Sequence, residues 1–184
     1  LVWRGFNHKL VRQDLLKLLM RFELTTEQVK RITNPEERER SGIKATEEEL
    51  LNNPYLISEM DLGSATSDPV GLDVIDRGMV PEGDGALFIP QATIYSPDDN
   101  RRIRAAATAV LSEEADPGDT VFSVPDLLTK IRSRFTEKRA CRPDRDLFMA
   151  DLEYYRKRLW ISMENDPPII ALRHIRDLEE IIAK

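Results

Sequence analysis

The sequence predicts a mainly helical protein that carries a small β-hairpin near its C-terminal end. Apolar residues recur at three- and four-residue steps through most of the chain, which is the spacing of amphipathic helices. Residues that start helices, such as Ser, Thr and Asn followed by acids or by Pro, stand in front of these segments. Charged residues make up 33% of the 184 positions, a share that suits exposed helices better than a buried parallel sheet.

The first part of the chain contains the patterns of several short helices. We expect an amphipathic helix over residues 8–22, with an apolar face formed by Leu10, Val11, Leu15, Leu18, Leu19 and Phe22. A threonine cap with an acid in the first turn predicts a second helix over 26–33. Asn34 and Pro35 predict the start of a third helix, because Pro fits the first helical position, and Gly42 predicts its end.

A second group of helix signals follows. Thr46 and Glu49 have the spacing of a capping box, and the helix that they begin must end before Pro54, which then starts the next helical turn. The next stretch is rich in Gly, Ser, Thr and Asp and has the composition of a loop. Pro69 then leads a helix that ends at Gly78, with an apolar face formed by Leu72, Val74 and Ile75.

The composition changes after residue 78. Two prolines and two glycines between 79 and 96 predict a loop, in which residues 86–89 can form a short strand. We therefore divide the chain into a helical domain at 1–80, a linker at 81–96 and a second domain at 97–184.

The second domain begins with a helix, a short strand and another helix. Ser96 and Pro97 start the first helix, which ends near Asp116 and has an apolar face formed by Ile103, Ala106, Ala107, Val110 and Leu111. Residues 120–124 predict a short extended piece. Ser123 then caps a helix that is expected to bury Leu127, Leu128 and Ile131.

A long helix, a hairpin and a final helix complete the second domain. The long helix is expected over 144–160, with inward side chains at Leu147, Phe148, Leu152, Tyr155 and Leu159. Apolar runs at 160–163 and 168–172 flank a Glu-Asn-Asp-Pro turn and predict a β-hairpin. The last helix is expected over 174–184. Helix, helix, hairpin and helix after a short first strand is the order of a winged-helix unit.

The composition excludes several classes of protein. The net charge of −6 predicts solubility and argues against nonspecific binding to nucleic acid, although a local basic patch can act on its own. The lone Cys141 excludes an internal disulfide and a cysteine-rich zinc site, and it fits the reducing cytoplasm. No apolar run approaches the roughly 18 residues of a membrane span, so no membrane partner is expected.

We expect no active site, no metal and no cofactor in this chain. A Gly-x-x-x-x-Gly-Lys phosphate loop is missing, since none of the eight glycines precedes a lysine. Residues 83–85 (Gly-Asp-Gly) lack the third glycine of a dinucleotide loop and predict a plain turn. His8 and His174 stand far apart and do not suggest a metal site. Basic neighbours would favour the thiolate of Cys141, but we interpret it as an incidental thiol on a basic loop.

One segment departs from the acidic character of the chain. Between positions 130 and 145, seven basic residues face two acidic ones, which gives a net charge of +5. The candidates for contacts with DNA phosphates are Lys130, Arg132, Arg134, Lys138, Arg139, Arg142 and Arg145. Counterion release would make such binding weak and salt-sensitive. The alternative is a solvated face, or internal ion pairs with the acidic remainder of the protein.

Three motifs occur in an order that is similar to one known family: Leu18-x-x-x-Phe22-x-Leu24-Thr25-x-x-Gln28, then Asn53-Pro54-Tyr55-Leu56, then Ile75-Asp76-Arg77-Gly78. They resemble the region before the motor in bacterial RecD-like ATP-dependent DNA helicases. Those are superfamily 1 enzymes related to the alpha subunit of exodeoxyribonuclease V. The later stretches 101–131 and 169–183 are similar to the family's next helices and to the elements that lead into its motor.

The resemblance implies helix-hairpin-helix units within residues 1–80, joined at the Asn-Pro-Tyr motif. In the family, a Gly-x-Gly hairpin of such units contacts the DNA backbone. Here residues 65–71 (Ala-Thr-Ser-Asp-Pro-Val-Gly) take its place. We therefore expect a degenerate helix-hairpin-helix-like bundle, and the basic segment becomes the better candidate for DNA contact.

The resemblance implies a non-catalytic N-terminal accessory domain of a DNA helicase. Such a domain would bind or guide DNA, or pack on the motor of the same parent chain, and the ATPase would lie in that motor. An alternative is a protein–protein interaction module without DNA contact, since degenerate hairpins survive as packing units and the net charge is acidic. A third hypothesis is a transcriptional regulator, which needs a dimerisation element and a recognition helix. Only residues 125–135 are a candidate for that helix.

Overall fold

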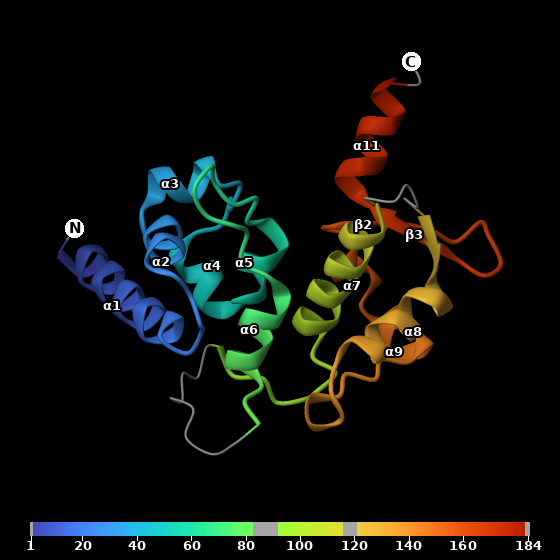
Figure 1. Ribbon diagram of the computed structural model, residues 1–184, viewed down its shortest axis with the longest axis horizontal. Helices are drawn as coiled ribbons and strands as arrows, with labels where there is room; N and C mark the ends of the chain where they lie inside the picture. The colour runs from blue at the N-terminus through green and yellow to red at the C-terminus, as the bar shows by residue number, and fades with distance from the viewer. Residues whose placement is uncertain (1, 83–91, 116–120, 183–184) are drawn as a thin grey trace. The chain divides into compact units, whose positions relative to one another are not determined.

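The computed structural model describes residues 2–82, 92–115 and 121–182, with side chains from Lys9 onward. The chain forms two compact units, residues 1–95 and residues 96–184 (Figure 1). It is mainly helical, as predicted, and its small antiparallel sheet lies in the second unit. Among the described residues, we find no helix with the length and apolar character that crossing a membrane requires.

The first unit is built from short helices. They are α1 (Val2–Leu19), α2 (Thr26–Thr33), α3 (Pro35–Arg40), α4 (Glu47–Asn52), α5 (Tyr55–Met60) and α6 (Leu72–Met79). Helix α1 packs against α4, α2 against α3, and α5 against α6. The core is mainly apolar and includes Leu15, Leu18, Ile32, Leu50, Ile57 and Ile75, but charged residues such as Arg31, Asp61 and Asp76 are also buried in this unit.

The predicted starts of α2, α3 and α4 are confirmed. Thr25 and Thr46 both form capping boxes, because each hydroxyl accepts a hydrogen bond from the N3 amide and each N3 side chain accepts one from the cap amide. Hydrogen bonds from the amide and hydroxyl of Thr46 lower the pKa of Glu49. Asn34 caps α3 in front of Pro35, and Gly42 follows that helix with a φ of 86°.

Two details of this unit differ from the prediction. Helix α1 begins at Val2 and ends at Leu19, and Leu10 is 44% exposed although it was expected on the apolar face. Helix α6 begins at Leu72, not at Pro69, because the amide of Val70 bonds to the side chain of Asp61 and holds the preceding residues in the loop. The strand expected at 86–89, and most of its loop, lie outside the described residues.

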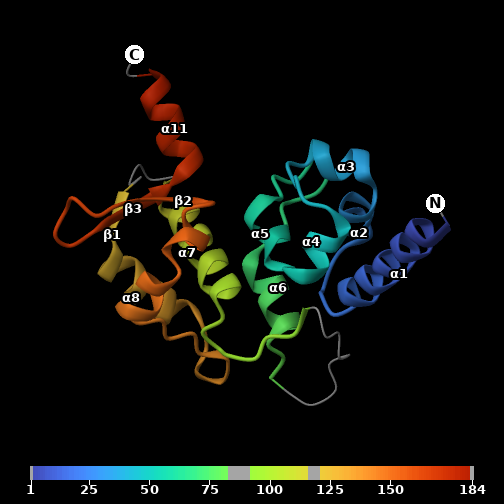
Figure 2. The same cartoon turned by 180° about the vertical axis from the view of Figure 1, so that it is seen from behind.

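The second unit contains helices and a three-stranded sheet (Figure 2). In chain order its elements are α7 (Asn100–Ala115), β1 (Val121–Ser123), α8 (Val124–Arg134), the 3-10 helix η2 (Glu137–Arg139), α9 (Arg145–Ala150), α10 (Leu152–Tyr155), β2 (Leu159–Ser162), β3 (Ile169–Leu172) and α11 (Arg173–Ile182). The strand order is β1-β3-β2 and both pairs are antiparallel. The predicted hairpin, the short first strand and the Ser123 cap are confirmed.

The prediction of one long helix over 144–160 is wrong. The chain forms two shorter helices, α9 and α10, with a break at Asp151. The rings of Phe148 and Tyr155 are stacked with centroids 4.4 Å apart. Residues seven positions apart in a continuous helix are separated by about 10 Å along its axis, so the break permits this buried stack. Leu147, which was expected to point inward, is 39% exposed.

The core of the second unit includes arginines. Apolar side chains of α7 and α8 are buried as predicted, among them Ile103, Leu127 and Ile131, and Ile170 of the sheet is buried as well. Arg102 and Arg104 on α7 are also buried. Their guanidinium groups lie over aromatic rings, Arg102 at 4.2 Å from the centroid of Phe135 and Arg104 at 4.0 Å from that of Tyr154.

Candidate nucleic-acid interface

The basic segment forms a continuous stretch of the second unit. It runs from the last turns of α8 through η2 to the start of α9. Lys130 is half-buried and Arg134 and Arg139 are partly buried, whereas the exposed cations are Arg132, Lys138, Arg142 and Arg145. Four of the seven predicted cations are therefore exposed, and the other three reach solvent only in part.

Three cations of the segment form ion pairs within the unit. Lys130 contacts Glu114 at 2.6 Å and Arg134 contacts Glu113 at 2.7 Å, so α8 is linked to the end of α7. Arg142 contacts Glu137 at 2.6 Å, with both side chains largely exposed. Exposed pairs of this kind contribute little to stability, so their cations can exchange a carboxylate for a phosphate at low cost.

Arg132 has a structural contact that the sequence did not predict. Its Nε and one terminal nitrogen both donate to the carbonyl oxygen of Pro143, at 3.0 and 2.6 Å. This fork ties the end of α8 to the loop before α9. Arg132 is therefore engaged in holding the segment together, although its side chain reaches the surface.

Arg102, on α7, forms hydrogen bonds to the backbone of the basic segment. It is fully buried and donates to the carbonyl oxygens of Pro97, Arg139 and Ala140, at 2.9, 2.6 and 3.3 Å. The sequence held one signal for this role, since Arg102 stands four residues before Ala106 and so shares the apolar face of α7. Cys141 is completely buried in the same region, so its thiol is not accessible at the surface.

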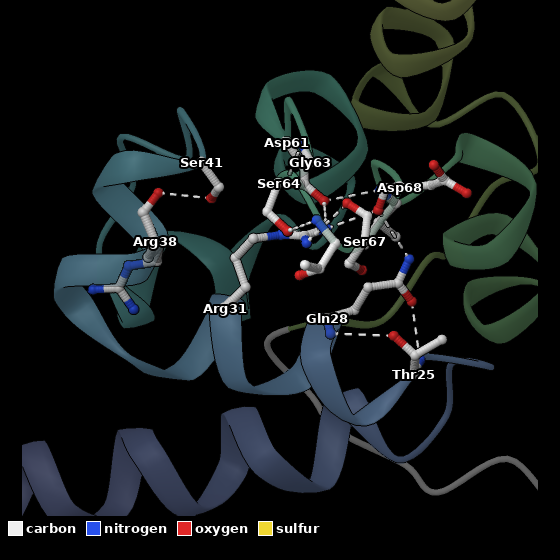
Figure 3. A network of polar contacts seen from close by, with 12 residues as sticks. Thr25, Gln28, Arg31, Arg38, Ser41, Asp61, Gly63, Ser64, Ser67 and Asp68 are labelled. Carbon is white, nitrogen blue, oxygen red and sulfur yellow. Dashed lines mark hydrogen bonds and ion pairs between the residues drawn. The ribbon is translucent and has the colours of Figure 1, made fainter.

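The loop at residues 61–71 lies in the first unit, between α5 and α6. Figure 3 shows the polar network that holds it. Arg31 on α2 contacts Asp61 at 2.7 Å, and the side chains of both residues are almost fully buried. Arg31 also donates to the carbonyl oxygens of Ser67 and Asp68, at 3.4 and 2.9 Å. Gln28 adds a further bond to the Asp68 carbonyl.

Asp61 fixes both ends of this loop. Its carboxylate accepts hydrogen bonds from the amides of Gly63 and Val70, at 3.1 and 2.8 Å. Gly63 has a φ of 75°, and an added Cβ would lie 2.9 Å from Pro69, so glycine is required there. Ser64 and Ser67 exchange backbone hydrogen bonds across the loop. The loop therefore has a defined conformation of its own.

A shallow polar groove lies beside this loop. Its volume is about 320 Å³, and its lining combines hydroxyl groups with charges of both signs: Glu27, Lys30, Arg31, Glu37, Arg40, Ser41, Gly63, Ser64 and Thr66. Lys30 and Glu37 pair across it at 3.7 Å, with Lys30 mostly exposed. The mixed charge of the lining gives it no clear preference for an anion.

The three motifs that carry the family resemblance meet in the core of the first unit. The Tyr55 hydroxyl donates to Asp76 Oδ1 at 2.9 Å, and both residues are fully buried. A Cβ added at Gly78 would lie 2.4 Å from the Phe22 ring and 2.5 Å from the Arg21 carbonyl oxygen. Burial lowers the pKa of Arg21 beside this contact. Phe22 and Tyr55, from the first two motifs, thus both contact residues of the third motif on α6.

Within the part of the chain that the structure describes, no three His, Cys, Asp or Glu side chains gather as a metal site would require. Comparisons with family models, with curated proteins and with solved structures find no match for this chain.

Proposed function

We propose that this chain is a non-catalytic accessory region of a RecD-like DNA helicase, which binds or guides DNA next to the motor. The observation that carries the proposal is the cluster of Phe22, Tyr55, Asp76 and Gly78. These residues come from three separated motifs that each resemble the family only weakly. Phe22 packs on Gly78 and Tyr55 bonds to Asp76, so both earlier motifs contact the third one on α6, which supports treating the three motifs as parts of one folded unit and not as separate chance matches.

The element order of the second unit supports a winged-helix-like role for it. Helix α7 is followed by strand β1, then by α8, by the pair α9 and α10, and by the hairpin β2–β3, with β1 beside β3 in the sheet. Helices α5 and α6, with the clamped loop between them, have the order of a degenerate helix-hairpin-helix unit. In both units the fold proposal comes from element order and not from DNA contacts.

DNA contact is assigned to the exposed part of the basic segment. Lys138, Arg142 and Arg145 are exposed and lie within eight positions of one another. Arg132 is bonded to Pro143 and Arg139 is partly buried, so we expect these two to shape the surface more than to contact phosphate. Phosphate contacts of this type supply affinity without reading sequence.

The test is a titration of fluorescent single-stranded and duplex DNA at several salt concentrations. Reversal of Lys138, Arg142 and Arg145 to Glu is expected to weaken affinity at least about tenfold. It should also reduce the slope of log affinity against log salt, by roughly 0.9 for each duplex phosphate contact that is lost.

A matched control reverses Lys9, Lys17 and Arg40 to Glu. These cations are exposed in the first unit, and the change in net charge is the same. It is expected to weaken affinity much less and to leave the salt slope unchanged. Equal effects of the two triple variants would mean that net charge, not the basic segment, controls binding, and the assignment would be wrong.

A protein–protein interaction module is the second candidate. Lys130, Arg134 and Arg142 already have carboxylate partners, which is the arrangement expected if the segment serves internal packing. This candidate predicts no DNA shift and a flat dependence on salt. The same titration therefore separates the two functions.

A further inference from the structure

A small pocket in the second unit adjoins the basic segment. Its volume is about 180 Å³, and its lining comes from α8 and from the first residue of α9: Val124, Pro125, Leu128, Thr129, Arg132 and Arg145. Val124 and Leu128 are almost fully buried, so they give the pocket an apolar floor. Arg132 and Arg145 are exposed, so their guanidinium groups belong to its outer edge.

The guanidinium group of Arg132 is held in one orientation. Its Nε and one terminal nitrogen both donate to the carbonyl oxygen of Pro143, at 3.0 and 2.6 Å. Because the donors of a guanidinium group point outward in its plane, these bonds fix the plane without occupying either face. A fixed planar cation at the edge of an apolar pocket is a surface on which a flat ring can stack.

Arg145 supplies a charge that no carboxylate neutralises. Within the described residues, its side chain has no hydrogen bond and no ion pair. Lys130, Arg134 and Arg142 of the same segment, in contrast, are paired with glutamates. An unpaired guanidinium group can bind a phosphate through two hydrogen bonds without first giving up another partner.

An apolar floor with guanidinium groups at its edge fits a ligand that combines a flat ring with a nearby anion. A nucleotide whose base is unpaired has both features. In a duplex the base is paired and stacked, and taking it out of the stack has a free-energy cost. A peptide with one apolar side chain and one carboxylate would also fit the pocket alone. Lys138 and Arg142 are exposed in the same segment, however, and several cations together favour a polyanion.

We propose that this pocket takes an unpaired base of single-stranded DNA, with Arg132 against the base and Arg145 on a neighbouring phosphate. The inference rests on the proposed function for DNA as the ligand, and it adds the form of DNA that the second unit selects. Phosphate contacts alone would bind single strands and duplexes without recognising a base.

The experiment compares two fluorescent single strands of equal length, one of thymidine nucleotides and one that is abasic at every position. Both strands carry the same phosphates, so a difference in affinity reports contacts with bases. The unmodified chain is expected to bind the thymidine strand about tenfold more tightly, which is within the usual effect of one stacked base.

Thr129→Leu is the variant that fills the pocket. A leucine in a helix points back over the preceding turn, where Pro125 also lines the pocket. This variant should bind the two strands equally. It should leave the slope of log affinity against log salt unchanged, because no phosphate contact is lost.

The matched control is Ser133→Leu, on the same helix but outside the pocket lining. Thr129 and Ser133 are both exposed, and each hydroxyl donates to a carbonyl oxygen of the preceding turn, so the two substitutions remove the same kind of bond. Ser133→Leu should keep the tenfold preference for the thymidine strand. Circular dichroism is expected to show the same helix content in both variants.

Arg145→Gln is expected to have the opposite pattern to Thr129→Leu. It should weaken binding of both strands and reduce the salt slope by roughly 0.7, the value for one phosphate contact on a single strand. The preference for the thymidine strand should remain.

Three results would overturn the inference. The first is equal affinity of the unmodified chain for the two strands, and the second is an equal effect of Thr129→Leu and Ser133→Leu. The third is tighter binding of an acidic peptide that ends in leucine than of the thymidine strand, with loss of that binding in Thr129→Leu. The pocket would then belong to a protein partner.

Duplex DNA measured with the same proteins separates this inference from the proposed function. Equal affinity for the two single strands, together with salt-sensitive duplex binding that reversal of Lys138, Arg142 and Arg145 weakens, overturns the base pocket alone. Absence of binding to the duplex and to both single strands overturns the DNA role itself.

Discussion

Each unit of the protein uses a buried arginine to hold an irregular segment, but the two arginines do so by different contacts. Arg31 forms an ion pair with the buried Asp61, whose carboxylate in turn binds two loop amides. Arg102 donates to three backbone carbonyl oxygens and lies over the ring of Phe135.

The two arginines differ in the kind of polar group that their removal would leave without a partner. Loss of Arg31 would leave a carboxylate that is 6% exposed without its cation. Loss of Arg102 would leave carbonyl groups at a partly buried position, where water can replace the lost donors at lower cost. Composition alone would assign both arginines to the charged surface, but each has a structural role in its unit. The groups that an arginine contacts decide how much stability it contributes.

Arg31→Met is expected to have the largest effect. It leaves the Asp61 carboxylate buried and unpaired, a change that typically costs about 3–5 kcal/mol. Native-state hydrogen exchange measures it, because the amides of Gly63 and Val70 bond to this carboxylate and should lose protection. The double variant Arg31→Met/Asp61→Asn removes the charge and should recover part of the loss. A double variant no more stable than Arg31→Met would show that the buried charge is not the cause.

Arg102→Met is expected to destabilise the second unit by a smaller amount, about 2–3 kcal/mol, because each unsatisfied buried polar group costs about 1–3 kcal/mol and water can reach some of these. Urea unfolding followed by Trp160 fluorescence measures it, with Trp3 replaced by Phe. Arg102→Lys keeps the charge but cannot reach three carbonyl groups, and should recover less than half. An effect of Arg102→Met equal to that of Arg31→Met would remove the distinction between the two units.

Tyr155→Phe is expected to have the smallest effect at neutral pH, within about 1 kcal/mol, because the Tyr155 hydroxyl has no hydrogen-bond partner among the described residues. Burial, followed by the charge of Asp151, raises the pKa of Tyr155 above its ordinary value of 10. The Tyr155 hydroxyl therefore keeps its proton to a higher pH in the folded state than in the unfolded state. Below pH 10 the hydroxyl is protonated in both states and does not change the free energy of unfolding. Above pH 10 the unfolded state loses this proton first, so the free energy of unfolding declines as the pH rises.

Urea unfolding at alkaline pH checks this dependence. The unmodified chain should lose stability above pH 10 more steeply than Tyr155→Phe does. Parallel curves for the two proteins would mean that Tyr155 ionises at its ordinary pKa in the folded state.

Local signals account for the helix starts that the sequence predicted. Thr25, Asn34, Thr46 and Ser123 act as caps through amides two or three positions away, so nearby residues suffice to identify them. The strands of the hairpin were also predicted locally, from two apolar runs and the turn between them.

Long-range contacts account for what the sequence did not predict. The break at Asp151 accompanies the stacking of Phe148 on Tyr155, whereas the helical spacing of apolar residues runs through this position and predicted one continuous helix. The partners of Arg31 lie 30 to 37 positions away. Those of Lys130 and Arg134 lie on another helix, so the composition of the basic segment could identify its cations but not their contacts.

The close contact between Gly78 and the turn at residues 21–22 has a consequence for how the first unit can be shortened. Helix α6 packs against the turn that follows α1, so residues near the two ends of this helical bundle contact each other. A truncated protein that starts after Phe22 would keep every motif from Asn53 to Gly78. It would nevertheless lack the surface against which α6 is seated, and we expect it to aggregate during expression.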